Sequence, residues 1–153
     1  MSCLKVLELK VPPPLIFILT LIVMSFVAEF QFVLTTPRLL IASFVCLIAI
    51  TIAASSIFAL YKASTTINPH RPDKSSTLIV EGIFKHTRNP MYLALVILLM
   101  AWSLFLDSYL SLAAIVPFII YITYFQIKPE EEFLNKKFAK EYSDYQSTVR
   151  RWL

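Results

Sequence analysis

The sequence contains a single glycine, Gly82, among its 153 residues. Nucleotide-binding sites of the Rossmann and P-loop types need several glycines, because the backbone must turn tightly and approach phosphate groups closely. One glycine cannot meet that need. If the chain binds a nucleotide-like cofactor, it must therefore use a different kind of site.

Cysteine and histidine are also scarce, with two residues of each type. Cys3 lies near the start of the chain, Cys46 lies inside an apolar run, and the two have no C-x-x-C spacing. His70 and His86 have no partners at metal-ligand spacing. The pattern argues against a disulfide framework and against a zinc site. We therefore expect no structural metal.

Charged residues make up only 16% of the chain, whereas hydrophobic residues make up 58%. The apolar residues form long, nearly uncharged runs, which cover residues 14–34, 39–61, 91–106 and 109–127. Because a helix of about 20 residues spans the hydrocarbon of a bilayer, the pattern predicts an all-α, multi-pass membrane protein with four transmembrane helices. The third run is short, so it either borrows part of the flanking polar segment or forms a tight hairpin with the fourth. Only Asp107 and Ser108 separate the two runs.

The basic residues predict an orientation in the membrane. Thirteen of the fourteen lie in the N-terminal segment, the 62–89 loop and the C-terminal tail, and only Arg38 lies on the other side. The positive-inside rule then places both termini and the central loop in the cytosol. The net charge of +4 is explained by topology and attraction to anionic lipid, without nucleic acid. A cleaved signal peptide within residues 1–30 is the rival, but the run is too long and lacks a clear cleavage site.

We expect one integral-membrane domain, residues 1–153, with two parts. Residues 1–61 would form two scaffold helices, in which small side chains allow close helix packing. Residues 62–153 would form a loop, a helical hairpin and a tail, with Pro117 kinking the second helix of the hairpin. The tail has apolar residues at the spacing of one helical face, which predicts a cytosolic amphipathic helix. These residues are Leu134, Phe138, Tyr142, Tyr145, Val149 and Trp152.

Two polar segments flank the predicted hairpin. Residues 82–92 read Gly-Ile-Phe-Lys-His-Thr-Arg-Asn-Pro-Met-Tyr and run directly into the third apolar run. Pro90 suits the first position of a helix, where its missing N–H is not needed. Glu130 and Glu131 follow the fourth run. If the two helices pair, these glutamates can meet the basic junction at the cytosolic face.

The two segments together resemble the integral-membrane methyltransferases of the isoprenylcysteine carboxyl methyltransferase family, whose relatives include phospholipid N-methyltransferases. The resemblance covers about residues 62–153. It is carried by Gly82-x5-Arg88-Asn89-Pro90-x-Tyr92 and by Glu130-Glu131 with the apolar tail stripe that follows. It implies an S-adenosylmethionine site. The cofactor contacts would be Ser76, Thr77, Leu78, Ile79, Phe84, Asn89, Pro90, Met91, Tyr92 and Glu130.

The chemistry of these positions suits that cofactor. Glu130 can pair with its ammonium group, and the aromatic faces of Phe84 or Tyr92 attract its sulfonium. Taken singly, Arg88 can equally be an interfacial anchor, Tyr92 part of an aromatic belt and Glu130 a solvated charge. The sequence also departs from the family, because Ala94 and Ala139 replace glycines that are usual there.

The methyl acceptor stays open at this point. The candidate catalytic residues are Arg88, Tyr92 and Glu131, and the candidate substrate-binding residues are Gln126 and Arg151. A carboxylate acceptor needs a nearby cation, Arg88 or Arg151, and Gln126 stands where the carboxyl methyltransferases have an arginine. An amine acceptor must lose a proton, for which Glu131 or Tyr92 are candidates.

We therefore expect methyl transfer from S-adenosylmethionine to a lipophilic acceptor, most similar to isoprenylcysteine carboxyl methylation of a prenylated small molecule or protein. The alternative in the same class is a phospholipid or another lipid amine. The alternative of another class is a non-catalytic membrane scaffold or a small transporter. A transporter predicts polar residues lining the middle of the membrane and internal repeats, and the sequence has neither.

Overall fold

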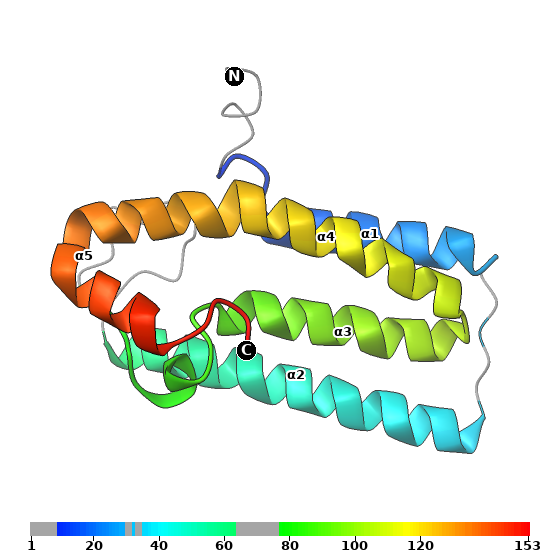
Figure 1. Cartoon of the computed structure of the whole chain (residues 1–153). Coiled ribbons are helices and arrows are strands. Elements are labelled where there is room, and N and C mark those ends of the chain that lie inside the picture. The colour runs from blue at the N-terminus through cyan, green and yellow to red at the C-terminus, as the bar shows by residue number, and fades with distance from the viewer. Residues whose placement is uncertain (1–8, 30–31, 33–34, 64–76) are drawn as a thin grey trace.

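The computed structural model describes residues 9–29, 32, 35–63 and 77–153, and all regular structure in these ranges is helical. Four helical segments run side by side in alternating directions (Figure 1). They are α1 (Pro13–Val27), α2 (Thr36–Lys62), α3 (Pro90–Leu106) and a last segment in which α4 (Ile115–Ile122) continues through the π-helical turn η5 (Thr123–Ile127) into α5 (Lys128–Thr148). The prediction of an all-α fold is confirmed for the described residues.

Prolines begin the first three helices. Pro13, Pro37 and Pro90 each lie at one of the first two helical positions, where no helical hydrogen bond is lost. The tight turn after α3 is also as expected. Asp107 ends this helix in the left-handed conformation with φ 48°, and the 3-10 turn η4 (Tyr109–Ala114) follows after one residue.

Three features differ from the predictions. The first run is helical only to Val27, and the turn that follows it reaches φ 52° at Glu29. Pro117 lies in the first turn of α4, just after the 3-10 turn η4, and not in the middle of a regular α-helix. The tail helix is bent at Ala139, where the backbone is not helical, with φ 40° and ψ −109°. After this bend the chain folds back toward α3 (Figure 1).

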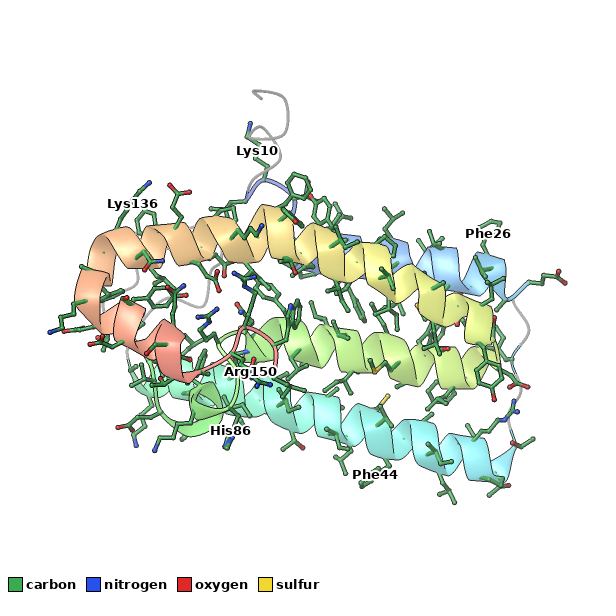
Figure 2. The ribbon with its side chains drawn as sticks, viewed as in Figure 1. Lys10, Phe26, Phe44, His86, Lys136 and Arg150 are labelled. Carbon is green, nitrogen blue, oxygen red and sulfur yellow. The ribbon has the colours of Figure 1, made fainter. Side chains whose placement is uncertain are left out.

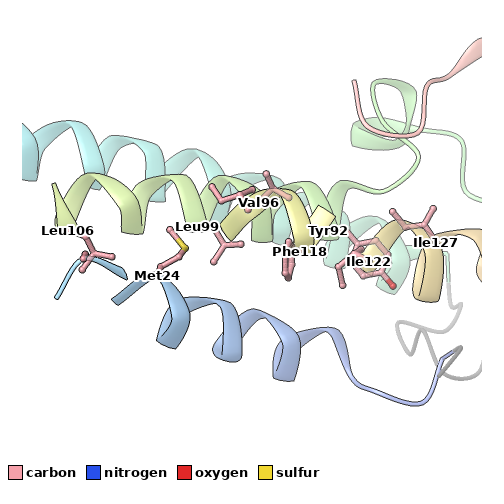
Figure 3. Packing of buried hydrophobic residues seen from close by; sticks show 10 residues of the cluster. Met24, Tyr92, Val96, Leu99, Leu106, Phe118, Ile122 and Ile127 are labelled. Atoms are coloured by element: carbon pink, nitrogen blue, oxygen red, sulfur yellow. The ribbon is translucent and has the colours of Figure 1, made fainter. Parts of the chain in front are cut away.

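The core lies between α1, α3 and the last helical segment. Met24, Leu99, Phe118 and Ile122 are 2% exposed or less and pack in one cluster, which extends along α3 in Figure 3. α2 lies along α3 on the other side. The core therefore fixes α3 as the central helix of the bundle.

The outer surface is strongly apolar. Leu40 and Phe58 of α2 are each 67% exposed, and Phe26 and Phe44 point away from the bundle in Figure 2. Exposed apolar surface of this extent is typical of contact with a membrane or partner. By length and composition, α2 with 27 residues and the continuous segment Tyr109–Thr148 with 40 can cross a membrane, whereas Pro13–Val27 and Pro90–Leu106 are shorter apolar helices.

Candidate functional site

The loop that leads into α3 is fastened to α5. Gly82 begins the 3-10 turn η3 (Gly82–Lys85) with φ 61°, a left-handed conformation that glycine adopts without strain. Two residues later, the Phe84 carbonyl accepts a hydrogen bond from the Tyr145 hydroxyl at 2.6 Å. The single glycine of the sequence therefore shapes the loop at the start of the site.

The residues after η3 are held by the stretch of chain that follows α5. The backbone N–H of Arg88 donates to the Arg150 carbonyl at 3.1 Å. The side chains of Thr87 and Asn89 both donate to the Arg151 carbonyl, at 3.3 and 2.9 Å. Thr87 is fully buried and Asn89 is 9% exposed. These bonds fix the start of α3 against the tail.

Glu131 accepts hydrogen bonds from two arginines. Arg88 donates through Nη2 at 2.9 Å, and Arg151 donates through Nε at 3.0 Å and through Nη2 at 2.6 Å. The side chains of Glu131 and Arg88 are only 9% and 11% exposed, so water screens their pairing weakly. The hydrogen bonds that Arg151 donates to Glu131 raise the pKa of Arg151, although partial burial acts in the opposite direction. The three side chains together carry one net positive charge.

Glu130 contacts a neutral partner instead. Tyr92, in the first turn of α3, donates its hydroxyl proton to Glu130 Oε1 at 2.5 Å. Glu130 lies beyond the apolar run that ends at Ile127. Burial raises the pKa of the Glu130 carboxyl to about 8, while the Tyr92 hydrogen bond opposes the shift and the charge of Glu131 adds to it. This bond joins the start of α3 to the end of the fourth apolar run, as the resemblance implied.

A cavity of about 380 Å³ lies between these elements, a size typical of sites for small molecules. Nine of the ten predicted cofactor positions line it, and the tenth, Ser76, lies outside the described residues. The catalytic candidates Arg88, Tyr92 and Glu131 line it as well. The nine cofactor positions are Thr77, Leu78, Ile79, Phe84, Asn89, Pro90, Met91, Tyr92 and Glu130.

The two predicted substrate-binding residues do not line this cavity. Gln126 lies in η5, fully buried, and its Nε2 donates to the Val11 carbonyl at 2.8 Å. The side chain therefore fastens the segment before α1 to the π-helical turn. Arg151 is bound to Glu131, which itself lines the cavity.

The sequence did not reveal the contribution of α2. Ala53, Ser56 and Leu60 line the cavity, at a spacing of three and four residues that places them on one helical face. Their region was expected to be scaffold, because small residues in a membrane helix usually serve packing. The hydroxyl of Ser56, a polar group inside an apolar run, was the feature of the sequence that could have indicated this part of the cavity. Pro13 and Pro14 of α1 were also missed.

Comparison with known proteins gives two matches. Residues 37–141 match a family described as phospholipid methyltransferase. An uncharacterized protein of Haemophilus influenzae is 46% identical over 63 residues, which are 41% of this chain and the whole of that protein. No solved structure matches the chain. The family match extends from the first turn of α2 to just beyond the bend in α5.

Proposed function

Because the chain belongs to the phospholipid methyltransferase family, we propose that it is a membrane enzyme that transfers a methyl group from S-adenosylmethionine to a lipid acceptor. The family implies methyl transfer to a lipid, and the residues of the cavity favour S-adenosylmethionine as the methyl donor. The hydrogen bond between Tyr92 and Glu130 is the observation that carries this proposal, because it brings the two motif segments to one cavity.

The residues of the cavity suit S-adenosylmethionine. That cofactor supplies a methyl group on a positively charged sulfonium. The Glu130 carboxylate would pair with the cofactor ammonium, and Phe84 and Tyr92 offer aromatic faces to a cation. Leu78 and Ile79 offer apolar contacts to the adenine. The protein then accelerates the reaction chiefly by holding the acceptor against the methyl group.

We propose a phospholipid amine as the first candidate acceptor. Arg88 and Arg151 both bind Glu131, which compensates part of the positive charge that they could offer to an acceptor carboxylate. The match to the phospholipid methyltransferase family favours a phospholipid acceptor. The amine must lose its proton before it attacks. Because Glu131 is engaged by the arginines, Tyr92 is the remaining candidate. As a neutral phenol it can take up that proton only while it passes its own hydroxyl proton to Glu130, which already accepts its hydrogen bond.

A prenylcysteine carboxylate is the second candidate, as in the isoprenylcysteine carboxyl methyltransferases. Arg88 lines the cavity, and its buried Nε has no hydrogen-bond partner among the described residues. That N–H could donate to an acceptor carboxylate. A carboxylate acceptor would need no general base.

We further propose that all four helical segments cross the membrane and that both termini and the cavity face the cytosol. α1 and α3 have 15 and 17 residues, which is short for a crossing. Their polar flanks would complete the span at the interfaces. The proposal is supported by the thirteen basic residues on one side.

A labelled-methyl assay tests the function. Detergent-solubilised protein is incubated with methyl-labelled S-adenosylmethionine and either total membrane phospholipid or a prenylcysteine analogue. A methyl label that stays on the phospholipid after base treatment indicates that an amine was methylated. A label that base releases indicates a methyl ester on a carboxylate. Glu130→Gln should weaken cofactor binding in calorimetry, whereas the exposed Glu132→Gln should bind as wild type. Wild-type protein that binds no cofactor and labels neither acceptor would favour the non-catalytic scaffold.

A further inference from the structure

The cavity-facing side of α2 carries one polar group, the hydroxyl of Ser56. Its side chain is fully buried, and its Oγ has no hydrogen-bond partner among the described residues. Serine and threonine in helices usually donate to the carbonyl four residues earlier. Thr51 of the same helix does so to Leu47 at 2.8 Å, and Ser25 of α1 does so to Leu21 at 2.8 Å. Ser56 makes no such bond.

An unsatisfied hydroxyl is costly in this location. Its neighbours along the cavity wall of α2 are the apolar Ala53 and Leu60, and Leu95 and Leu98 of α3 line the same cavity. Inside a membrane protein, water and lipid tails offer little compensation to such a group. Because Ser56 is one of the residues that line the cavity, a molecule that fills the cavity can supply the missing partner.

We propose that Ser56 is a binding residue whose Oγ–H donates a hydrogen bond to an acceptor atom of the bound ligand. The inference rests on the proposed function and extends the site to α2, beyond the two motif segments. Two ligands offer such an atom. One is the adenosine part of S-adenosylmethionine, and the other is the ester region of a phospholipid acceptor.

The test compares Ser56→Ala with Ser55→Ala, a matched control because Ser55 is the exposed neighbour on α2. Three quantities are measured for each protein: the Tm without ligand, the Kd of S-adenosylmethionine by calorimetry, and the KM for phospholipid. Without ligand, Ser56→Ala should have an unchanged or higher Tm, because it removes an unsatisfied polar group. One ligand parameter should worsen about 2- to 10-fold, as expected for one lost hydrogen bond.

The parameter that changes identifies the partner. A weaker Kd assigns the hydrogen bond to the cofactor, and a raised KM alone assigns it to the lipid. A lower ligand-free Tm would mean that the hydroxyl bonds within the protein, which overturns the inference. Unchanged Kd and KM in Ser56→Ala, beside an active wild type, overturn it as well and leave the proposed function intact. A wild type that neither binds the cofactor nor methylates lipid defeats both.

Discussion

Two adjacent glutamates have opposite surroundings. Glu130 meets the neutral phenol of Tyr92, whereas Glu131 meets the guanidinium groups of Arg88 and Arg151. The side chains of consecutive helical residues point about 100° apart, so these two neighbours in the sequence can face different partners. Glu131 therefore joins Arg88 to Arg151, whereas Glu130 joins Tyr92 at the cavity.

The protonation of Glu130 predicts two opposite pH dependences. Burial raises its pKa from 4.5 to about 8, so the folded protein favours the protonated acid and loses the corresponding stability as the pH rises toward that value. The Tm of ligand-free wild type should therefore fall between about pH 5 and pH 8. The affinity for S-adenosylmethionine should rise over the same range, because its ammonium pairs with the carboxylate. Thermal unfolding and calorimetry at several pH values measure both.

Glu132→Gln is the control for this pH experiment, because Glu132 forms an exposed pair with Lys136. Glu132→Gln should keep the wild-type dependence of the Tm and of the cofactor affinity on pH. Glu130→Gln should weaken both of these pH dependences. A cofactor affinity that does not change with pH in wild type would contradict the pairing with Glu130.

Removing the charge of Glu131 should destabilise the protein. Glu131→Gln leaves the nearly buried Arg88 without its counter-charge, and breaking a buried pair from one side costs about 3 kcal/mol. Chemical denaturation in detergent measures the loss, with Glu132→Gln again as the surface comparison. A loss of less than about 1 kcal/mol, the usual range for surface pairs, would show that the cluster is solvated.

At the scale of helices, the sequence predicted most of the architecture. The long apolar runs located α2 and α3 closely, and Pro90 marked the start of α3, because helices that face lipid need apolar side chains all round. The bend at Ala139 was not predicted, since alanine favours helices, although glycine is usual at this position in the family that the sequence resembles. The bend accompanies hydrogen bonds between the tail and residues 84–89, contacts far apart in the chain. The α2 wall of the cavity was missed because small residues serve packing and cavity lining alike.

The bend predicts a stabilising substitution. Ala139 has φ 40° and ψ −109°, a conformation that costs a residue with a Cβ about 1 kcal/mol or more. Ala139→Gly should therefore raise the Tm, since glycine adopts such angles freely. Ala94→Gly is the matched control, because Ala94 lies buried inside α3 and glycine there should cost about 1 kcal/mol. Equal losses in both variants would mean that Ala139 is unstrained.

The whole molecule is polar at one end and apolar along its sides. Lys10, His86, Lys136 and Arg150 lie toward the end that contains the cavity, whereas Phe26 and Phe44 lie along the apolar part (Figure 2). This asymmetry suits a bundle that spans a bilayer with its site at one surface. The polar end should therefore face the cytosol.

Cysteine labelling tests that orientation. In a variant with both native cysteines replaced by serine, Tyr109→Cys marks the hairpin, where Tyr109 is 86% exposed, and Lys136→Cys marks the polar end. A membrane-impermeant maleimide should label Tyr109→Cys in intact cells and Lys136→Cys only after permeabilisation. The reverse pattern would place the cavity outside the cytosol.

The bonds from Thr87 and Asn89 to the Arg151 carbonyl have a consequence for biosynthesis. A ribosome that has translated as far as Thr148 has made all the helices that the structure describes, but not the Arg150 and Arg151 carbonyls that hold the start of α3. The nascent chain can thus occupy the bilayer before it can assemble its pocket. Proteolytic trimming of those few residues would leave an inserted protein with an open, poorly formed pocket.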